Sequence, residues 1–361
     1  APCHVLDAKY EAGSYCTVLY QVGDALLTAV LTLDGSSGPD GGVELGPGLR
    51  GFAFPDDPKL PGLAAAMDGA TLASALDVGR RTRVDVSLLR YRPGKRATLR
   101  LELRGSDTTR VLIGKVYSAE RKAAAVFIET RQLAAALAGE PAVSVAPAEA
   151  YLDAIPMVVW HAVAGVGMEQ RLDASGGADL VHAAAGAVAA LHAAPVVSER
   201  TRPIAAELAR FRRRGQQVAR VAPTVGATLL SWAGRLEEAG AEVDRSTTGL
   251  VHGDCKPSQF HTTSAGLALL DFDHCGVADP ASDVGTFLAS LRQRSREALE
   301  GAFLHAYAEA VAEADIAERA RWYESVALLR KALRAFARSP QSPVPGILAA
   351  EGLKCLERGT R

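Results

Sequence analysis

The sequence lacks several features that would each indicate a particular class of protein. Its cysteines are odd in number and form no C-x-x-C pair, which argues against a disulfide framework and a ribbon-type zinc site. Its 40 basic residues do not outnumber its 41 acidic ones, so the basic excess typical of nucleic-acid-binding proteins is missing. No apolar run approaches the roughly 20 residues that cross a bilayer. We therefore expect neither a nucleic-acid partner nor a membrane partner.

The beginning of the chain, APCHVLDAKYEAG, lacks the basic and then apolar stretches of a secretory signal peptide. This pattern predicts a cytoplasmic protein. The 361 residues correspond to about two domains at roughly 150 residues each. With 48% hydrophobic and 22% charged residues, the composition is that of an ordinary globular protein.

Lysine is scarce, with only eight among the 40 basic residues, so a lysine at the end of an apolar strand pattern needs a specific reason. Lys115 is such a residue. It lies in the last of three alternating segments within 82–117, TRVDVSLLRY, ATLRLEL and RVLIGKVY, which predict an antiparallel meander. A helix is expected from Ser118 to Gly139. Two further strands are expected in VSVAP and in IPMVVWHAVAG.

The rest of the chain is predicted to be mostly helical, with a strand-rich interruption at 249–271. We expect helices at 178–194, 203–221, 224–241, 280–298, 300–313 and 316–337, and a last short helix after SPQSPVPG. This pattern predicts an N-terminal β-rich cap module at 1–75, a small antiparallel-sheet lobe at 76–165 and a helical lobe at 166–361.

The first 75 residues contain a predicted strand, ALLTAVLTL, and a glycine- and proline-rich loop at 34–62. A weak internal repeat relates residues 8–20 to residues 89–101. Three pairs in it are identical at an offset of 81: Tyr10/Tyr91, Gly13/Gly94 and Thr17/Thr98. Two explanations are open, a duplicated hairpin module or two ordinary hairpins that agree by chance, because repeat architectures normally have several copies.

The most informative stretch is 250–285. One apolar strand ends in the tripeptide His252-Gly253-Asp254, and a second, LALL, ends in Asp271-Phe272-Asp273. The turn TTSAG between them predicts a hairpin that brings the two acidic clusters side by side. Crowded His, Cys and Asp residues here also allow a zinc hydrolase interpretation, but their spacing matches no common zinc pattern.

Phosphoryl transfer needs a carboxylate for the acceptor hydroxyl, oxygen ligands that hold Mg²⁺ against the nucleotide, and a lysine for the phosphates. Asp254 suits the first task and Lys115 the third. Oxygen ligands are available from Asp271, Gln259 and Asp273.

These residues resemble the motifs of the aminoglycoside phosphotransferase and choline kinase family, which has the protein-kinase-like fold. The match is carried by His252, Gly253, Asp254, Gln259 and Asp271, and the resemblance covers residues 82–335. It implies an α+β, bilobal fold with a small antiparallel-sheet N lobe and a mostly helical C lobe, here with an extra N-terminal hairpin module. It also implies ATP and Mg²⁺ as cofactors and a small-molecule hydroxyl as acceptor.

The resemblance further implies roles for single residues of the helical lobe. Asp254 becomes the catalytic base, with His252 as the residue that orients its loop. Asp271 becomes the principal Mg²⁺ ligand, and Asp273 a further candidate. For the second ligand position the alternatives are Gln259 and its neighbour Ser258.

In the small lobe, the resemblance implies that Lys115 contacts the nucleotide phosphates and pairs with a glutamate of the following helix. Glu129 is the preferred candidate and Glu120 the second. The loop that covers the phosphates, YRPGKR, has a single glycine, Gly94. The strand MVVWHAVAG fits the hinge, whose backbone would bind adenine at Trp160, His161 and Ala162.

Two functions remain from different classes. The first is an ATP-dependent kinase of a small-molecule hydroxyl, on an amino sugar, an aminoglycoside-like antibiotic, a sugar or an amino alcohol. The alternative is a nucleotide-binding pseudokinase or regulatory protein of the same fold. Four acidic residues of the C-terminal helices either bind a cationic amino sugar or form a solvated acidic face. They are Glu309, Glu313, Asp315 and Glu318.

Overall fold

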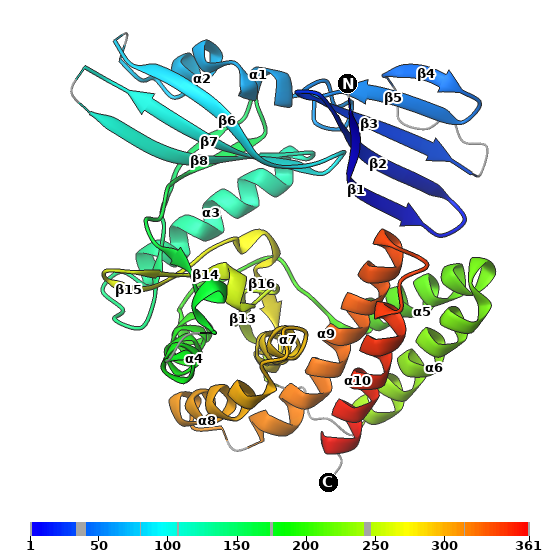
Figure 1. Cartoon of the computed structure of the whole chain (residues 1–361). Helices are drawn as coiled ribbons and strands as arrows, with labels where there is room; N and C mark the ends of the chain where they lie inside the picture. The colour runs from blue at the N-terminus through cyan, green and yellow to red at the C-terminus, as the bar shows by residue number, and fades with distance from the viewer. Residues whose placement is uncertain are drawn as a thin grey trace. The chain divides into compact units, whose positions relative to one another are not determined.

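The computed structural model describes residues 2–33, 41–79, 81–106, 108–173, 176–241, 247–313 and 315–359 (Figure 1). Residues 34–40 of the predicted glycine- and proline-rich loop lie outside these ranges. The chain divides into two compact units. The first contains Ala1–Arg131, Pro147–Ala162 and Ala337–Ser339, and the second contains Gln132–Ala146, Val163–Phe336 and Pro340–Arg361. The division into domains at 1–75, 76–165 and 166–361 stays a prediction.

The first unit begins with an antiparallel five-stranded sheet of order β1-β2-β3-β5-β4 (Figure 1). Its strands are β1 (Cys3–Glu11), β2 (Tyr15–Val22), β3 (Ala25–Thr32), β4 (Val43–Gly46) and β5 (Leu49–Ala53). Two short helices follow, α1 (Leu63–Met67) and α2 (Gly69–Ala75). The predicted strand ALLTAVLTL is thus confirmed as β3.

The second sheet of this unit contains the predicted meander, which is confirmed. Its order is β10-β11-β8-β7-β6, and every neighbouring pair is antiparallel. The strands are β6 (Arg83–Arg92), β7 (Arg96–Arg104), β8 (Thr109–Tyr117), β10 (Ala148–Leu152) and β11 (Met157–His161). The predicted helix is α3 (Glu120–Ala136).

One expected strand is shorter than its pattern and pairs outside the meander sheet. VSVAP forms only the two-residue strand β9 (Ser144–Val145), which pairs in parallel with β15 (Gly266–Leu269) of the second unit. The fifth strand of the meander sheet is instead β10. So short a segment has no hydrophobic pattern of its own, and its partner is decided by where the chain passes after α3.

The two faces of the meander sheet pack against different parts of the chain. Because side chains alternate along a strand, Leu112 and Val116 of β8 face one side, and Lys115 and Tyr117 face the other. The first side shares a hydrophobic core with the N-terminal segment, including Leu60, Leu63 and Leu72. Tyr117 packs with α3 on the second side. Residues 1–75 therefore share their core with the small lobe's sheet.

The weak repeat corresponds to two hairpins of the same register. Tyr10 is opposite Cys16 in the β1–β2 hairpin, and Tyr91 is opposite Ala97 in the β6–β7 hairpin. Their turns place Gly13 and Gly94 at φ +72° and +67°, where a Cβ is disfavoured. Two ordinary hairpins of equal length would share this geometry as well, so both explanations of the repeat stay open.

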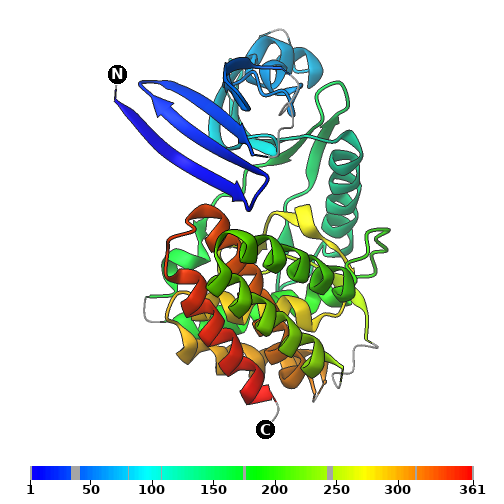
Figure 2. The same cartoon turned by 90° about the vertical axis from the view of Figure 1, so that its right-hand side faces the viewer.

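The second unit is mostly helical, as predicted. Its helices are α4 (Gly177–Ala193), α5 (Ile204–Val221), α6 (Pro223–Gly240), α7 (Ala281–Arg292), α8 (Glu300–Val311), α9 (Ile316–Arg338) and α10 (Val344–Gly359). Figure 2 shows α5 and α6 in green as a packed pair, and α6 also contacts α10, drawn in red. No helix in the described ranges is both long and apolar enough to cross a membrane.

Short strands and single turns carry the motif-bearing stretch. The strands are β12 (Val166–Gly167), β13 (Gly249–Val251), β14 (Phe260–Thr263), β15 and β16 (Gly276–Ala278). The turns are η1 (Met168–Arg171), η2 (Pro257–Gln259), η3 (Phe272–His274) and η4 (Glu297–Leu299). β14 and β15 form the predicted hairpin around TTSAG, and β13 pairs with β16.

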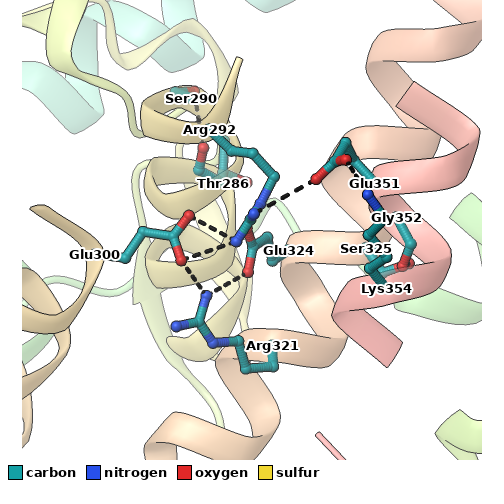
Figure 3. Close-up of polar contacts among 10 residues, drawn as sticks. All are labelled: Thr286, Ser290, Arg292, Glu300, Arg321, Glu324, Ser325, Glu351, Gly352 and Lys354. Carbon is teal, nitrogen blue, oxygen red and sulfur yellow. Dashed lines mark hydrogen bonds and ion pairs between the residues drawn. The ribbon is translucent and has the colours of Figure 1, made fainter. Parts of the chain in front are cut away.

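A buried ion-pair network fixes the C-terminal helices (Figure 3). Arg292, at the end of α7, contacts Glu300 of α8 at 2.7 Å and Glu324 of α9 at 2.7 Å. Arg321 bridges the same two carboxylates, and Glu351 of α10 approaches Arg292 at 3.6 Å. Replacing one member of the network by a neutral residue would leave a buried charge without its opposite. The network therefore sets the mutual placement of α7, α8, α9 and α10.

Candidate active site

The loop after β13 is held in place by the buried carboxylate of Asp283, which lies near the start of α7. Its oxygens accept the backbone N–H groups of His252 at 2.5 Å and of Gly253 at 2.8 Å. His192 Nε2 lies 3.2 Å from the same carboxylate. Burial raises the pKa of Asp283, but the hydrogen bond and electrostatic interaction with His192 and the hydrogen bond from the backbone of His252 outweigh it, so the pKa lies below its usual range. An ionised Asp283 thus fixes the backbone that precedes Asp254.

Gly253 occupies a position that no other residue fits. Its φ is +75°, and an added Cβ would collide with the guanidinium of Arg202 and the carbonyl oxygen of His274. Arg202 itself donates to that carbonyl at 2.5 Å. The central glycine of the tripeptide is therefore required by packing and by backbone conformation.

His252 is fully buried, and its ring nitrogens are directed at the loop itself. Nε2 donates to the carbonyl oxygen of Leu270 at 2.8 Å, while Nδ1 accepts the backbone N–H of Asp254 at 3.3 Å. The ring packs against Phe272 with centroids 5.1 Å apart. His252 thus joins the loop of Asp254 to the end of β15, which fits the orienting role expected for it.

Asp254 is half-buried and has two polar neighbours on one oxygen, Oδ2. Lys256 Nζ donates to it at 2.5 Å, and Gln259 Nε2 donates at 3.3 Å. Burial raises the pKa of Asp254, but the charge of Lys256 and its hydrogen bond lower the pKa by more. The pKa therefore lies below its usual range, and the carboxyl stays ionised.

Asp271 follows β15 and adopts a left-handed backbone conformation, with φ +66° and ψ +62°. Such conformations are uncommon outside glycine and concentrate at functional sites. The backbone N–H of Leu270 donates to the carbonyl of Gln259 at 2.9 Å, so the hairpin joins the backbone just before Asp271 to Gln259. Asp273 is 3% exposed, and its carbonyl accepts from Arg200 at 3.1 Å.

The donor set fits Mg²⁺ rather than a zinc-type cluster. No group of three His, Cys, Asp or Glu side chains converges as a metal site in the described ranges. Mg²⁺ is commonly held by one or two carboxylates together with phosphate oxygens and waters. Asp271 can supply the carboxylate. Gln259 donates from Nε2 to Asp254, and its Oε1, the acceptor atom of the same amide, is a candidate for a neutral oxygen ligand.

In the first unit, Lys115 lies on the α3-facing side of β8 and is 8% exposed. Its Nζ lies 5.7 Å from the ring centroid of Trp160 on β11, within cation–π range. Glu129 of α3 is also buried, whereas Glu120 is exposed. A buried charge is costly without an opposite one, so of the two glutamates Glu129 is the better partner for Lys115.

The predicted hinge residues stand at the end of β11. His161 is exposed, with Nε2 3.2 Å from the carboxylate of Glu149. The backbone N–H of Ala162 donates to the carbonyl of Val111 at 3.2 Å. That amide is therefore engaged within the first unit, and Trp160 and His161 are paired with β8 in the sheet. The binding of adenine at Trp160, His161 and Ala162 stays a prediction.

Gly94 lies at the tip of the β6–β7 hairpin and is anchored by Asp57, which sequence reasoning missed. Oδ2 of Asp57 accepts the Gly94 N–H at 2.6 Å and the Tyr91 hydroxyl at 2.8 Å. Its Oδ1 accepts the N–H of Lys59 at 2.9 Å. Asp57 is 3% exposed, so these bonds satisfy a buried charge. An acidic residue between prolines, in FPDDPKL, was the only signal in the sequence.

Asp283 was also missed, although it ends the segment ADPASD.

The four acidic residues predicted in or near the C-terminal helices have structural contacts of their own. Glu313 and Asp315 bond to the buried Arg319 at 2.6 and 2.9 Å, and Glu309 lies 3.3 Å from His305 on the surface. Three of the four therefore take part in ion pairs, and whether any of them binds a cationic amino sugar stays a prediction.

The sequence model of the phosphotransferase enzyme family (APH) matches residues 94–323, more than half of the chain. The protein belongs to this family. No curated protein matches the chain. The family assignment confirms the resemblance noted in the motifs.

Solved structures show the same fold at low sequence identity. The choline kinase from Cryptosporidium parvum Iowa II has a TM-score of 0.58 at 10% identity, covering 82% of this chain and 94% of its own. The aminoglycoside phosphotransferase APH(4)-Ia, in a ternary complex with ADP and hygromycin B, has a TM-score of 0.57 at 14% identity, with coverages of 81% and 99%. The amicoumacin kinase hAmiN, in complex with AMP-PNP and Ca²⁺, has a TM-score of 0.54 at 14% identity, covering 76% of this chain and 88% of its own. The predicted α+β, protein-kinase-like fold with an antiparallel-sheet N lobe and a helical C lobe is confirmed.

Proposed function

We propose that this phosphotransferase moves the γ-phosphoryl group of ATP to a hydroxyl of a small molecule, with Mg²⁺ as the divalent ion. The observation that carries the proposal is the ionised Asp254, whose backbone is fixed by the buried Asp283 while its own side chain contacts Lys256 and Gln259. A carboxylate held in this way can orient an acceptor hydroxyl and take its proton.

The proposed division of roles follows the positions of the side chains. Asp271 and Gln259 hold Mg²⁺, with Asp273 close by in sequence. Lys115, steadied by Glu129, contacts the nucleotide phosphates, and Gly94 covers them from its hairpin. The metal ion supplies charge neutralisation for the phosphates. A cytoplasmic location and the absence of a nucleic-acid partner remain predictions.

The test is ADP release against a panel of amino sugars, aminoglycosides, sugars, sugar acids and amino alcohols, measured with the wild type and with Asp254→Asn. Asparagine keeps the shape of the side chain but cannot accept the proton. We expect the variant to lose about 10²-fold or more in kcat while its affinity for ATP stays close to that of the wild type. A wild-type protein that binds ATP but releases no ADP with any acceptor would instead be the regulatory protein of this fold.

A further inference from the structure

Two arginines of the segment between α4 and α5 bind the single turn η3. Arg200 donates from Nη1 to the carbonyl oxygen of Asp273 at 3.1 Å and from Nη2 to that of Phe272 at 3.2 Å. Arg202 donates from Nη1 to the carbonyl oxygen of His274 at 2.5 Å. Two guanidinium groups therefore bind the three successive carbonyls of one turn.

The backbone that carries these arginines is itself held in place. The Val277 N–H donates to the Arg200 carbonyl at 2.7 Å, and the Arg202 N–H donates to the Val277 carbonyl at 2.9 Å. Thr201 thus forms a parallel bridge with Val277 of β16, and β16 pairs with β13 (Figure 1). Because side chains alternate along an extended segment, Arg200 and Arg202 lie on the same face of it. The segment therefore extends the short sheet and presents both arginines to η3.

The turn η3 begins directly after Asp271, the carboxylate proposed to hold Mg²⁺. Asp271 has a left-handed backbone conformation with φ +66°. A residue with a Cβ is disfavoured in that conformation, so the surrounding contacts must hold it there. The arginines bind the three residues that follow Asp271 in the chain. Their bonds therefore fix the backbone on the side of Asp271 where the turn begins.

Arg202 also packs against the loop of Asp254. A Cβ added to Gly253 would lie 2.2 Å from Nη1 of Arg202 and 2.2 Å from the carbonyl oxygen of His274. The guanidinium, that carbonyl and the backbone of Gly253 are thus in direct contact. One arginine therefore contacts both the residue before Asp254 and the turn after Asp271.

These three bonds differ from those of other arginines in the same unit. Arg292 binds the carboxylates of Glu300 and Glu324 (Figure 3), and Arg330 binds that of Glu207 at 2.6 Å. Those pairs neutralise opposite charges. The η3 carbonyls are neutral, and a guanidinium there supplies directed, charge-assisted donors in a planar fork. Such donors are suited to holding a backbone turn in one conformation.

We propose that Arg200 and Arg202 are positioning residues of the metal site, which hold η3 so that the carboxylate of Asp271 stays where it binds Mg²⁺. The proposal rests on the function proposed above and adds two residues from outside both motifs. Neither arginine is a metal ligand, because both act through the backbone of the turn. Partners that orient a metal ligand typically contribute about 10- to 100-fold to metal affinity.

The test measures metal binding without turnover. Mn²⁺ replaces Mg²⁺, and electron paramagnetic resonance follows free Mn²⁺ as it is titrated into the full chain saturated with ADP. We expect Arg200→Gln and Arg202→Gln to weaken Mn²⁺ binding about tenfold or more. Their affinity for ADP without a divalent ion should change little. Arg213→Gln, at an exposed position of α5, is the matched control.

The direction of the change separates positioning from other effects of the charge. Removing a positive charge near a cation site would by itself strengthen metal binding, whereas loss of positioning weakens it. A role in stability alone would lower the thermal unfolding midpoint and leave the Mn²⁺ affinity of the folded protein unchanged. Arg200→Lys keeps the charge but not the planar fork, so it should also weaken Mn²⁺ binding. This variant decides the question if a glutamine variant fails to fold.

A double-mutant cycle shows whether the arginines act through Asp271. Arg200→Gln should add little to the loss of Mn²⁺ affinity caused by Asp271→Asn, because both changes disable the same ligand. In turnover assays, the Mg²⁺ concentration that gives half the maximal rate should rise about tenfold or more in Arg200→Gln. The KM for the acceptor should change little.

Several outcomes would overturn the proposal. Unchanged or tighter Mn²⁺ binding in the arginine variants would do so, and so would losses that add fully to that of Asp271→Asn. If only Asp271→Asn weakens Mn²⁺ binding, the metal ligand stands and the positioning role fails. If Asp271→Asn leaves Mn²⁺ binding unchanged, both fail. If all these variants weaken Mn²⁺ binding but no acceptor ever yields ADP, the kinase activity fails and the positioning role stands.

Discussion

The backbone N–H of Gly94 donates to Oδ2 of Asp57 at 2.6 Å, although 37 residues separate the two. Asp57 belongs to the N-terminal segment, and Gly94 is the single glycine of the loop proposed to cover the nucleotide phosphates. The same oxygen accepts the Tyr91 hydroxyl. Burial and the charge of Asp57 hold the pKa of Tyr91 well above its usual range, so the phenol remains a donor. The N-terminal segment thereby fixes the tip of the β6–β7 hairpin.

Asp57→Asn should weaken ATP binding. The amide keeps one acceptor oxygen but loses the charge that draws both donors, so the loop tip becomes less ordered. We expect the KM for ATP to rise roughly tenfold, the size of one charge-assisted hydrogen bond, with little change in acceptor KM. Asp56→Asn, at the exposed neighbouring position, is the control. Unchanged ATP kinetics in Asp57→Asn would show that this anchor serves stability only.

Asp283→Asn should lower both stability and turnover. The variant weakens two charge-assisted bonds to the backbone of His252 and Gly253, and each such bond contributes about 1.5–3 kcal/mol. Chemical denaturation measures the loss of unfolding free energy, and ADP release measures turnover. The exposed Asp179→Asn is the matched control. A stable variant with full turnover would remove Asp283 from the positioning role.

The carboxyl group of Asp283 also predicts that the wild type loses stability at low pH. The folded-state pKa of Asp283 lies below its ordinary value of about 3.9. Its stabilising contribution is therefore complete above that value and is lost as pH falls through the lower folded-state pKa. The difference in unfolding free energy between wild type and Asp283→Asn should shrink as pH falls below about 4. A difference independent of pH would contradict this assignment.

Lys115→Ala should reduce both the affinity for ATP and kcat/KM, because the point charge on the phosphates is lost. Glu129→Gln should act in the same direction if it steadies Lys115. The double variant should then be less impaired than the sum of the two single effects, in a double-mutant cycle on ATP affinity. Lys122→Ala, at an exposed position of α3, is the control. Strictly additive effects would argue against the pairing.

Gln259→Ala should raise the Mg²⁺ concentration that gives half the maximal rate, because one neutral oxygen ligand is removed. Gln259→Asn should not improve the enzyme, since the backbone is set for the longer side chain. Ser258→Ala should leave the Mg²⁺ dependence unchanged. The reverse result, a shift in Ser258→Ala and none in Gln259→Ala, would assign the second ligand position to Ser258.

Much of the local structure could be predicted from the sequence because its signals are short in range. Period-2 alternation located β6, β7 and β8, and helical spacing located α4 to α9 within a few residues, apart from the overextended end of α7. The turn TTSAG located the β14–β15 hairpin. The tripeptide at 252–254 and the lone Lys115 indicated the chemistry, since few other functions need those residue types after apolar strands.

The sequence by itself thus determined the family and most of the elements after residue 82, and it proposed the reacting side chains. The tertiary structure alone decided which distant residues support them. Asp57 reaches Gly94, Asp283 reaches the loop at His252 from 31 positions away, and Arg200 reaches the carbonyl of Asp273 from 73 positions away. β9 likewise pairs with β15, more than 120 residues further along the chain. Such contacts depend on how the whole chain closes and packs, and a side chain carries no local pattern that names its distant partner.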